Sequence, residues 1–122
     1  MTNNKHSKTK RKRGIKLQLR RIAYNASESY LVIQLTNTSG ITFEIDFLKV
    51  YRVNGNKKRK SSFQKLEKKP IYICHMPSKI YNSQSVRLVY VLPKFVLGSK
   101  EKLQLELQEL NGSRKVLLKK RL

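Results

Sequence analysis

The chain alternates apolar and polar residues in a series of short segments, and this pattern constrains its fold more than any other feature. In residues 14–20, Ile15, Leu17 and Leu19 alternate with lysine, glutamine and arginine. A period of two gives an extended strand one apolar face and one solvated face. Clusters of Ser, Asn and Gly interrupt the chain between such segments, and no segment has a convincing helical period. We therefore expect seven or eight short β-strands.

Two strand patterns predict local detail. The apolar phase shifts through Arg21, which indicates a β-bulge or the end of a strand. Within residues 41–53, the alternation predicts that Phe43, Ile45 and Phe47 share one face. The expected strands, with the fourth left open as a weak strand or a loop, cover residues 14–24, 30–38, 41–53, 57–69, 70–76, 84–92, 101–110 and 114–122.

The turn signals favour an antiparallel arrangement. Asn54-Gly55 and Asn111-Gly112 each predict a β-hairpin, the second with a two-residue type I′ turn that needs positive φ at both positions. Residues 101–110 could also form a helix, but the Asn-Gly hinge favours a strand. Short strands with frequent turns are typical of an antiparallel β-sandwich of immunoglobulin-like type. A small barrel is the alternative architecture.

The 122 residues support one domain, with 28 Lys and Arg against 7 Asp and Glu and a net charge of +21. Residues 1–13 are basic and carry almost nothing to bury, so we expect a disordered tail or linker before a folded domain over residues 14–122. The alternative for this tail is an arm that grips phosphate or a localisation signal. No apolar run has the length of a membrane helix, and the N-terminus lacks the apolar stretch of a secretory signal.

The residue types give no support for an enzyme, a cofactor, a metal site or a small-molecule substrate. His75 is adjacent to Cys74, and neighbouring residues of a strand point to opposite faces, so the two cannot easily form a catalytic pair. Cys74 is the single cysteine, and we expect it to be buried and unreactive. Glu44 and Asp46 could chelate a cation, but pairing with Lys or Arg across the sheet is favoured.

Basic clusters are the remaining candidate sites. They can bind phosphate by charge alone, and proteins that read single strands add exposed aromatic residues. We expect Phe43, Phe47 and Tyr90 to be in the core, which leaves Phe63 and Tyr81 as exposed aromatics. The candidate contacts for a polyanion or a partner are Lys57, Lys58, Arg59, Lys60, Lys68 and Lys69. A solvated basic surface that binds nothing specifically is the alternative.

Four segments, in this order and at these spacings, resemble the C-terminal domain of the TraN family of conjugative-transposon proteins. They are GIKLQL (14–19), LTNTSGITFEIDFLKV (35–50), VYVLPKF (89–95) and KLQLELQELNGSR (102–114). The most specific parts are N-x-S-x-I-x-F-x-I-D-F at 37–47 and L-x-L-E-L-x-E-x-N-G-x-R at 103–114.

The resemblance implies a component of a conjugative DNA-transfer apparatus, similar to type IV secretion, that works through contacts with other proteins of the apparatus and not by catalysis. It implies the periplasm or cell envelope as location, if the domain derives from a longer exported protein. The alternative is a basic β module that binds nucleic acid, with non-specific charge contacts to DNA. The resemblance supplies no catalytic or ligand residues.

Overall fold

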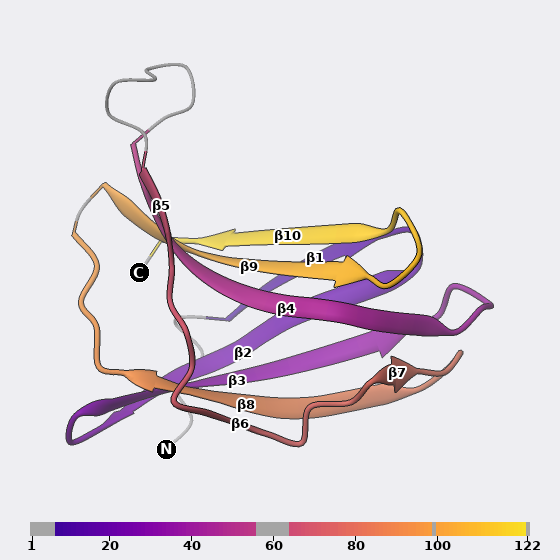
Figure 1. Cartoon of the computed structure of the whole chain (residues 1–122), viewed down its shortest axis with the longest axis horizontal. Coiled ribbons are helices and arrows are strands. Elements are labelled where there is room, and N and C mark those ends of the chain that lie inside the picture. Colours follow the sequence, from indigo (N-terminus) through magenta and orange to yellow (C-terminus); the bar gives the residue numbers. More distant parts are fainter. Residues whose placement is uncertain (1–6, 56–63, 99, 122) are drawn as a thin grey trace.

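The computed structural model describes residues 7–55, 64–98 and 100–121, and these form ten strands in two antiparallel sheets (Figure 1). The strands are β1 (Lys8–Lys12), β2 (Ile15–Asn25), β3 (Glu28–Asn37), β4 (Phe43–Asn54), β5 (Gln64–Glu67), β6 (Tyr72–Cys74), β7 (Lys79–Ile80), β8 (Ser85–Pro93), β9 (Glu101–Glu109) and β10 (Lys115–Lys120). The prediction of an all-β antiparallel sandwich is confirmed. The strand count exceeds the predicted seven or eight because β1 and the two-residue β7 were not expected.

The two sheets pack face to face. Sheet one has the strand order β1-β2-β3-β8-β6, and sheet two has the order β10-β9-β4-β5, with β7 added beside the first residues of β4. In Figure 1 sheet two is the upper layer, and the chain crosses from β5 down to β6 along one side. β3 lies at the centre of sheet one, as its continuous apolar run predicted.

The core lies between the sheets and consists mainly of alternating Leu, Ile and Val. Ile15, Leu17 and Leu19 of β2 face Leu103, Leu105 and Leu107 of β9 across the same core, and all six side chains are fully buried. Tyr90 adds a polar link, because its hydroxyl donates a hydrogen bond of 2.6 Å to the Leu48 carbonyl of the opposite sheet. Burial raises the pKa of Tyr90 well above the ordinary value, so its hydroxyl stays protonated and able to donate.

The expected disorder of residues 1–13 is wrong for the part that the structure describes. Residues 8–12 form β1, which pairs with residues 15–19 of β2. Two residues, Arg13 (φ 50°) and Gly14 (φ 78°), connect these strands, and two positive φ values are the mark of a type I′ turn. Gly14 also packs tightly, because a Cβ there would lie 2.6 Å from Ser39 Cα. Backbone pairing with β2 thus orders a segment with no apolar side chains, which becomes the edge strand of sheet one.

The β9–β10 hairpin exists, but its turn is longer than predicted. Asn111 has a positive φ of 55°, but Gly112 does not have a positive φ. The turn is therefore not of type I′, which needs positive φ at both positions. The Glu109 amide donates to the Arg114 carbonyl at 2.9 Å, which leaves four residues in the loop. The hairpin after Asn54-Gly55 is also present, since Asn54 pairs with Gln64, but its tip lies outside the described residues.

Phe47 is not in the core, contrary to the prediction. The pairing of β4 with β9 shifts between Ile45 and Phe47, so Asp46 is an extra residue in the strand. This bulge reverses the alternation: Phe43 is fully buried before it, and Leu48 and Val50 are buried after it. Phe47 therefore lies on the outer face, where the ammonium of Lys49 sits 4.4 Å from its ring centroid.

Candidate nucleic-acid interface

The positive charge is concentrated in sheet one. Its five strands contain eight Lys or Arg residues and one carboxylate, Glu28. In sheet two, β10, β9, β4 and β5 contain seven Lys or Arg residues and six carboxylates, and β7 adds Lys79. Within the residues that the structure describes, none of the ion pairs includes a cation from the strands of sheet one. Sheet one therefore presents unbalanced charge to an approaching anion.

Several cations of sheet two make contacts within that sheet. Arg52 forms a two-pronged pair with Glu101 (2.6 and 2.8 Å), and the carboxylate of Glu106 lies between Lys65 (3.2 Å) and Lys115 (3.4 Å). Lys65 also covers the ring of Tyr51 at 4.2 Å. These cations neutralise carboxylates or cover aromatic rings, which makes them poor candidates for binding a partner.

The outer face of sheet one carries arginines that a β-bulge places together. The pairing of β2 with β3 shifts between Leu19 and Arg21, as the sequence phase shift indicated. Arg20 is the extra residue, and Arg21 pairs with Val32, whose neighbours Leu31 and Ile33 face the core. Two consecutive arginines thus lie at the outer side of the sheet, next to Arg87 of β8.

Arg20 and Arg87 converge on one neutral acceptor. Arg20 Nη1 and Arg87 Nη2 donate to the same Gln34 Oε1, at 3.2 and 3.3 Å. The Gln34 amide in turn donates to Ser85 Oγ at 2.8 Å, and Ser85 shares a hydrogen bond of 2.7 Å with Thr36. Two guanidinium groups are held side by side with an uncharged amide between them, an arrangement whose repulsion a bound anion would relieve.

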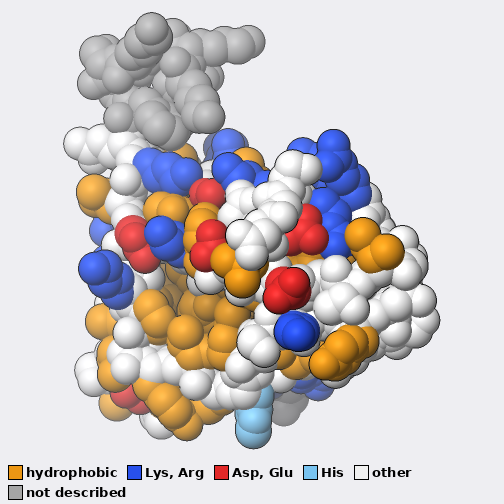
Figure 2. Space-filling view, turned by 45° about the vertical axis from the view of Figure 1, so that its right-hand side comes forward, with side chains coloured by type: hydrophobic (Ala, Val, Ile, Leu, Met, Phe, Trp, Pro, Cys, Tyr) orange, Lys and Arg blue, Asp and Glu red, His pale blue; other side chains and the backbone are white. Residues whose placement is uncertain are grey.

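A second basic feature runs along the rim where β1 and β10 lie side by side. Its groove is lined by Lys8, Lys10, Lys12, Lys115, Leu117, Leu118 and Lys119. The three β1 lysines pair with Leu19, Leu17 and Ile15 and so point to the core side of the sheet. Inward-pointing lysines on an edge strand prevent pairing with other chains, so the rim has a structural explanation. Figure 2 shows Lys and Arg mainly in the upper half of the molecule, at the height of β1 and β10 in Figure 1.

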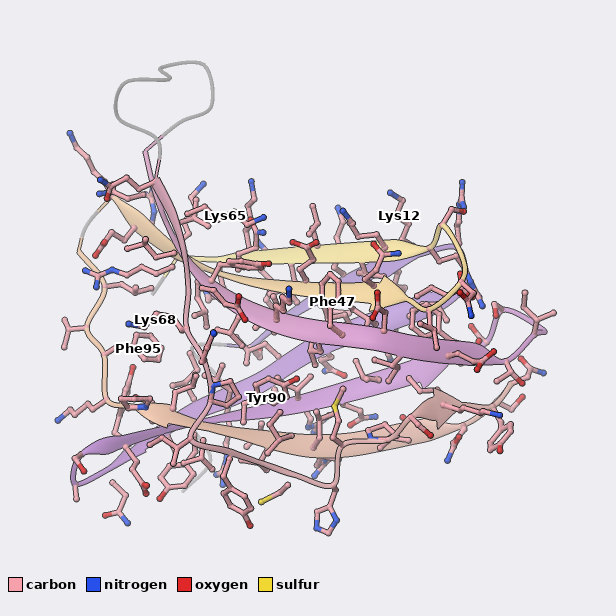
Figure 3. All side chains as sticks on the ribbon, in the orientation of Figure 1. Lys12, Phe47, Lys65, Lys68, Tyr90 and Phe95 are labelled. Atoms are coloured by element: carbon pink, nitrogen blue, oxygen red, sulfur yellow. The ribbon has the colours of Figure 1, made fainter. Side chains whose placement is uncertain are left out.

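Of the contacts predicted from sequence, the two that the structure describes, Lys68 and Lys69, belong to neither feature. Lys57, Lys58, Arg59 and Lys60 lie outside the described residues, as does Phe63. Lys68 is half-buried and Lys69 is exposed, directly after β5 of sheet two. Figure 3 shows Lys68 and Lys12 far apart along the sandwich. The sequence analysis missed Arg20, Arg21 and Arg87, although the phase shift at Arg21 was the signal for two of them.

The two motifs that carry the resemblance contribute residues to a polar cluster at one end of the sandwich. Arg114 makes a bidentate pair with Glu109 (3.0 and 2.7 Å) and also donates to Ser39 Oγ at 2.9 Å and to the Thr42 carbonyl at 3.0 Å. Its guanidinium lies 5.0 Å from the ring centroid of Phe43. The hydrogen bond from Arg114 lowers the pKa of the Glu109 carboxyl. This cluster ties the β3–β4 loop to the β9–β10 loop.

Asn37, the last residue of β3, is the buried member of this cluster. Its side chain is fully buried, donates to the carbonyls of Ile41 (2.7 Å) and Ile80 (2.8 Å), and accepts from the Ser39 amide (2.9 Å) and hydroxyl (2.7 Å). A buried amide with all these partners is a structural element. Asn37, Ser39, Glu109 and Arg114 therefore hold the loops together, and most of their polar groups are used within the cluster.

The remaining chemistry is sparse. Within residues 7–55, 64–98 and 100–121, no group of three or more His, Cys, Asp or Glu side chains gathers as a metal site would require. Cys74 is half-buried in β6, so the prediction of a buried thiol is wrong, and the exposure of Tyr81 is confirmed at 58%. Over the part of the chain described, no helix has the length and apolarity to cross a membrane.

The ion pairs described do not include Glu44 or Asp46, contrary to the expectation that these carboxylates would pair across the sheet. Both residues are at the start of β4, around its bulge. Asp46 is the extra residue of that bulge, so it has no directly opposed partner on β9.

Comparison with known proteins gives one match. No curated protein and no solved structure matches the chain. A family model described as a domain of unknown function, DUF4138, matches residues 2–121 and so includes β1 within the domain. The chain belongs to the DUF4138 family.

Proposed function

We propose that this domain is a non-catalytic interaction domain of a conjugative DNA-transfer apparatus, of the TraN type and similar to type IV secretion. It acts by contact with other proteins of the apparatus in the periplasm or cell envelope. The observation that carries the proposal is the cluster of Asn37, Ser39, Glu109 and Arg114. These residues come from the two segments in which the chain most specifically resembles the TraN family. The resemblance therefore includes residues that hold this fold together.

The edges of the sheets indicate where a partner would bind. β1 and β10 carry lysines that oppose strand addition. On the other side of the sandwich the edge strands β5 and β6 are short. Leu66 of β5 and Ile71, directly before β6, are each 57% exposed. Exposed apolar residues beside open strand edges are suitable for a protein contact, which strand addition could extend.

Site-specific photo-crosslinking in a mating-competent cell tests this proposal. A photoreactive amino acid replaces Leu66 or Ile71 in the full-length protein, and Val96, which is 77% exposed, is the matched control position. We expect crosslinks to envelope transfer proteins from positions 66 and 71 and not from position 96. Loss of the gene should also reduce DNA transfer. The proposal would be overturned if neither copurification nor crosslinking recovered a protein of the transfer apparatus.

Nucleic-acid binding is a second candidate function, and the unbalanced charge of sheet one favours it. Binding through phosphate contacts weakens steeply as salt rises. A titration with labelled DNA at several salt concentrations measures this, and absence of binding at low salt would overturn it. The variant Lys68→Gln/Lys69→Gln tests the contact that the sequence indicated.

A further inference from the structure

The outer face of sheet one has a layout that neither a solvated surface nor an edge-protection device explains. Its residues form successive cross-strand rows. Arg11, Lys16, Thr36 and Ser85 form one row, and Gln18, Gln34 and Arg87 form the next, with Arg20 beside them. These rows combine cations with neutral hydrogen-bonding groups and contain no carboxylate.

The following rows become apolar and then aromatic. Arg21 pairs with Val32, and one row further Tyr30 and Tyr72 both pair with Val91 from opposite sides. Directly paired side chains lie on the same face of a sheet, so the two tyrosines flank Val91 and bury it to 4% exposure. The hydroxyl of Tyr30 is held by Glu28, the single carboxylate of this sheet, at 2.5 Å. Tyr72 is 59% exposed and is the freer ring.

The spacing of these groups suits a chain of alternating phosphates and bases. Rows of one face are about 6.6–6.8 Å apart, and neighbouring strands are about 4.8 Å apart. Arg87 is two rows and one strand from Tyr72, and Arg21 is one row and three strands from it, so each lies about 14–16 Å away. A few nucleotides of an extended single strand can cover this span. Arg20 and Arg87 each use one guanidinium N–H on Gln34, and a guanidinium has five. The rest can contact phosphate oxygens.

We propose that the outer face of sheet one binds single-stranded nucleic acid, with phosphates on Arg20, Arg21 and Arg87 and a base stacked on Tyr72. Single strands expose base faces to an aromatic side chain, whereas a duplex hides them and presents only phosphates to a flat face. The inference rests on the second candidate function and gives it a site and a strand preference. It does not depend on the protein contact at Leu66 and Ile71.

Fluorescence anisotropy with labelled oligothymidylate of about 16 nucleotides and with a duplex of equal length tests the proposal. The chain is titrated between about 50 and 200 mM salt. We expect tighter binding of the single strand. Arg20→Gln/Arg87→Gln should weaken it about tenfold and lower the salt slope by about 1.4, from ~0.7 per phosphate contact. Tyr72→Ala should weaken single-strand binding about tenfold and leave duplex binding unchanged.

The matched control is Lys79→Gln/Lys102→Gln, which removes the same charge from exposed positions on β7 and β9 of the other layer. If both double variants weaken binding equally, the site is wrong although nucleic-acid binding stands. If the wild-type chain binds neither probe, both this proposal and the second candidate function are wrong. Equal competition by polyglutamate, or unchanged single-strand binding by Tyr72→Ala, would also overturn the proposal.

Discussion

The two sheets of this sandwich share a core but treat charge in opposite ways. Sheet two contains nearly as many carboxylates as cations, and it joins them in pairs such as Arg52–Glu101 and Lys65–Glu106. Sheet one contains one carboxylate among eight cations, and two of its arginines share the neutral oxygen of Gln34. The same strand geometry thus supports a self-neutralised face and a face with charge left over.

The difference separates charge that belongs to the fold from charge available for contact. A paired cation in sheet two stabilises its neighbours. Unpaired cations in sheet one repel one another and destabilise the compact state. Folding gives no reason to gather Arg20, Arg21 and Arg87 on one face, so a binding partner is the better explanation for them.

The largest difference between the two kinds of cation should appear when one arginine of each is replaced. Arg114→Met removes a guanidinium whose side chain is 9% exposed and strands Glu109, so we expect a loss of about 3–5 kcal/mol of unfolding free energy. Arg87→Met removes the same charge from an exposed position and should change it by less than about 0.5 kcal/mol. Urea unfolding measures both. Equal losses would mean that charge, and not the buried pair, sets the effect.

Tyr90→Phe tests the polar link between the sheets. The substitution keeps the buried ring but leaves the Leu48 carbonyl without the hydrogen bond that crosses the core. We expect a loss of about 1–2 kcal/mol in unfolding free energy, the cost of an unsatisfied buried acceptor. Tyr30→Phe, whose hydroxyl meets Glu28 on the outer face, is the control and should cost less. A neutral Tyr90→Phe would show that the two sheets are held by apolar packing alone.

The sequence predicted the sandwich because alternation and turn residues are local signals. Ile15, Leu17 and Leu19 had to share a face whichever strands they paired with. The prediction that Phe47 lies in the core was wrong because of the bulge at Asp46. This bulge arises from the pairing of β4 with β9, and the alternation of residues along one strand carries no information about that pairing. β1 was missed because its order comes from backbone pairing and the turn at Arg13-Gly14, and composition carries no signal for that.

The candidate site was harder to predict than the fold. Sequence reasoning favours runs of cations, and Lys57–Lys60 is such a run. Arg20 and Arg21 come from β2 and Arg87 comes from β8, 66 or 67 positions later in the sequence. The two strands meet only through β3. Their grouping depends on strand order and on the bulge at Arg20, and neither can be read from local pattern.

Acid should weaken the pairs of sheet two. The hydrogen bonds from Arg114 and Arg52 lower the pKa values of Glu109 and Glu101 in the folded state. Their contribution is therefore complete above the unfolded pKa of about 4.3, and it is lost as pH falls through the lower folded values. We expect Glu101→Gln/Glu109→Gln to flatten the fall of stability from pH 5 to about 3, measured by urea unfolding. Glu67→Gln, at an exposed position of β5, should keep the wild-type profile.

The smallest expected effect is a gain in unfolding free energy, and it comes from replacing arginines of sheet one. Arg20→Gln/Arg87→Gln removes two neighbouring positive charges without stranding a carboxylate, so it should raise the unfolding free energy at low salt by about 0.5 kcal/mol or less. Because ions screen exposed charges, the gain should vanish near 1 M salt, where the Debye length is about 3 Å. Thermal unfolding across a salt series measures it, with Lys79→Gln/Lys102→Gln beside it. A loss of stability would mean that the arginines hold sheet one together through Gln34. That result would remove the reason for treating their charge as available to a ligand.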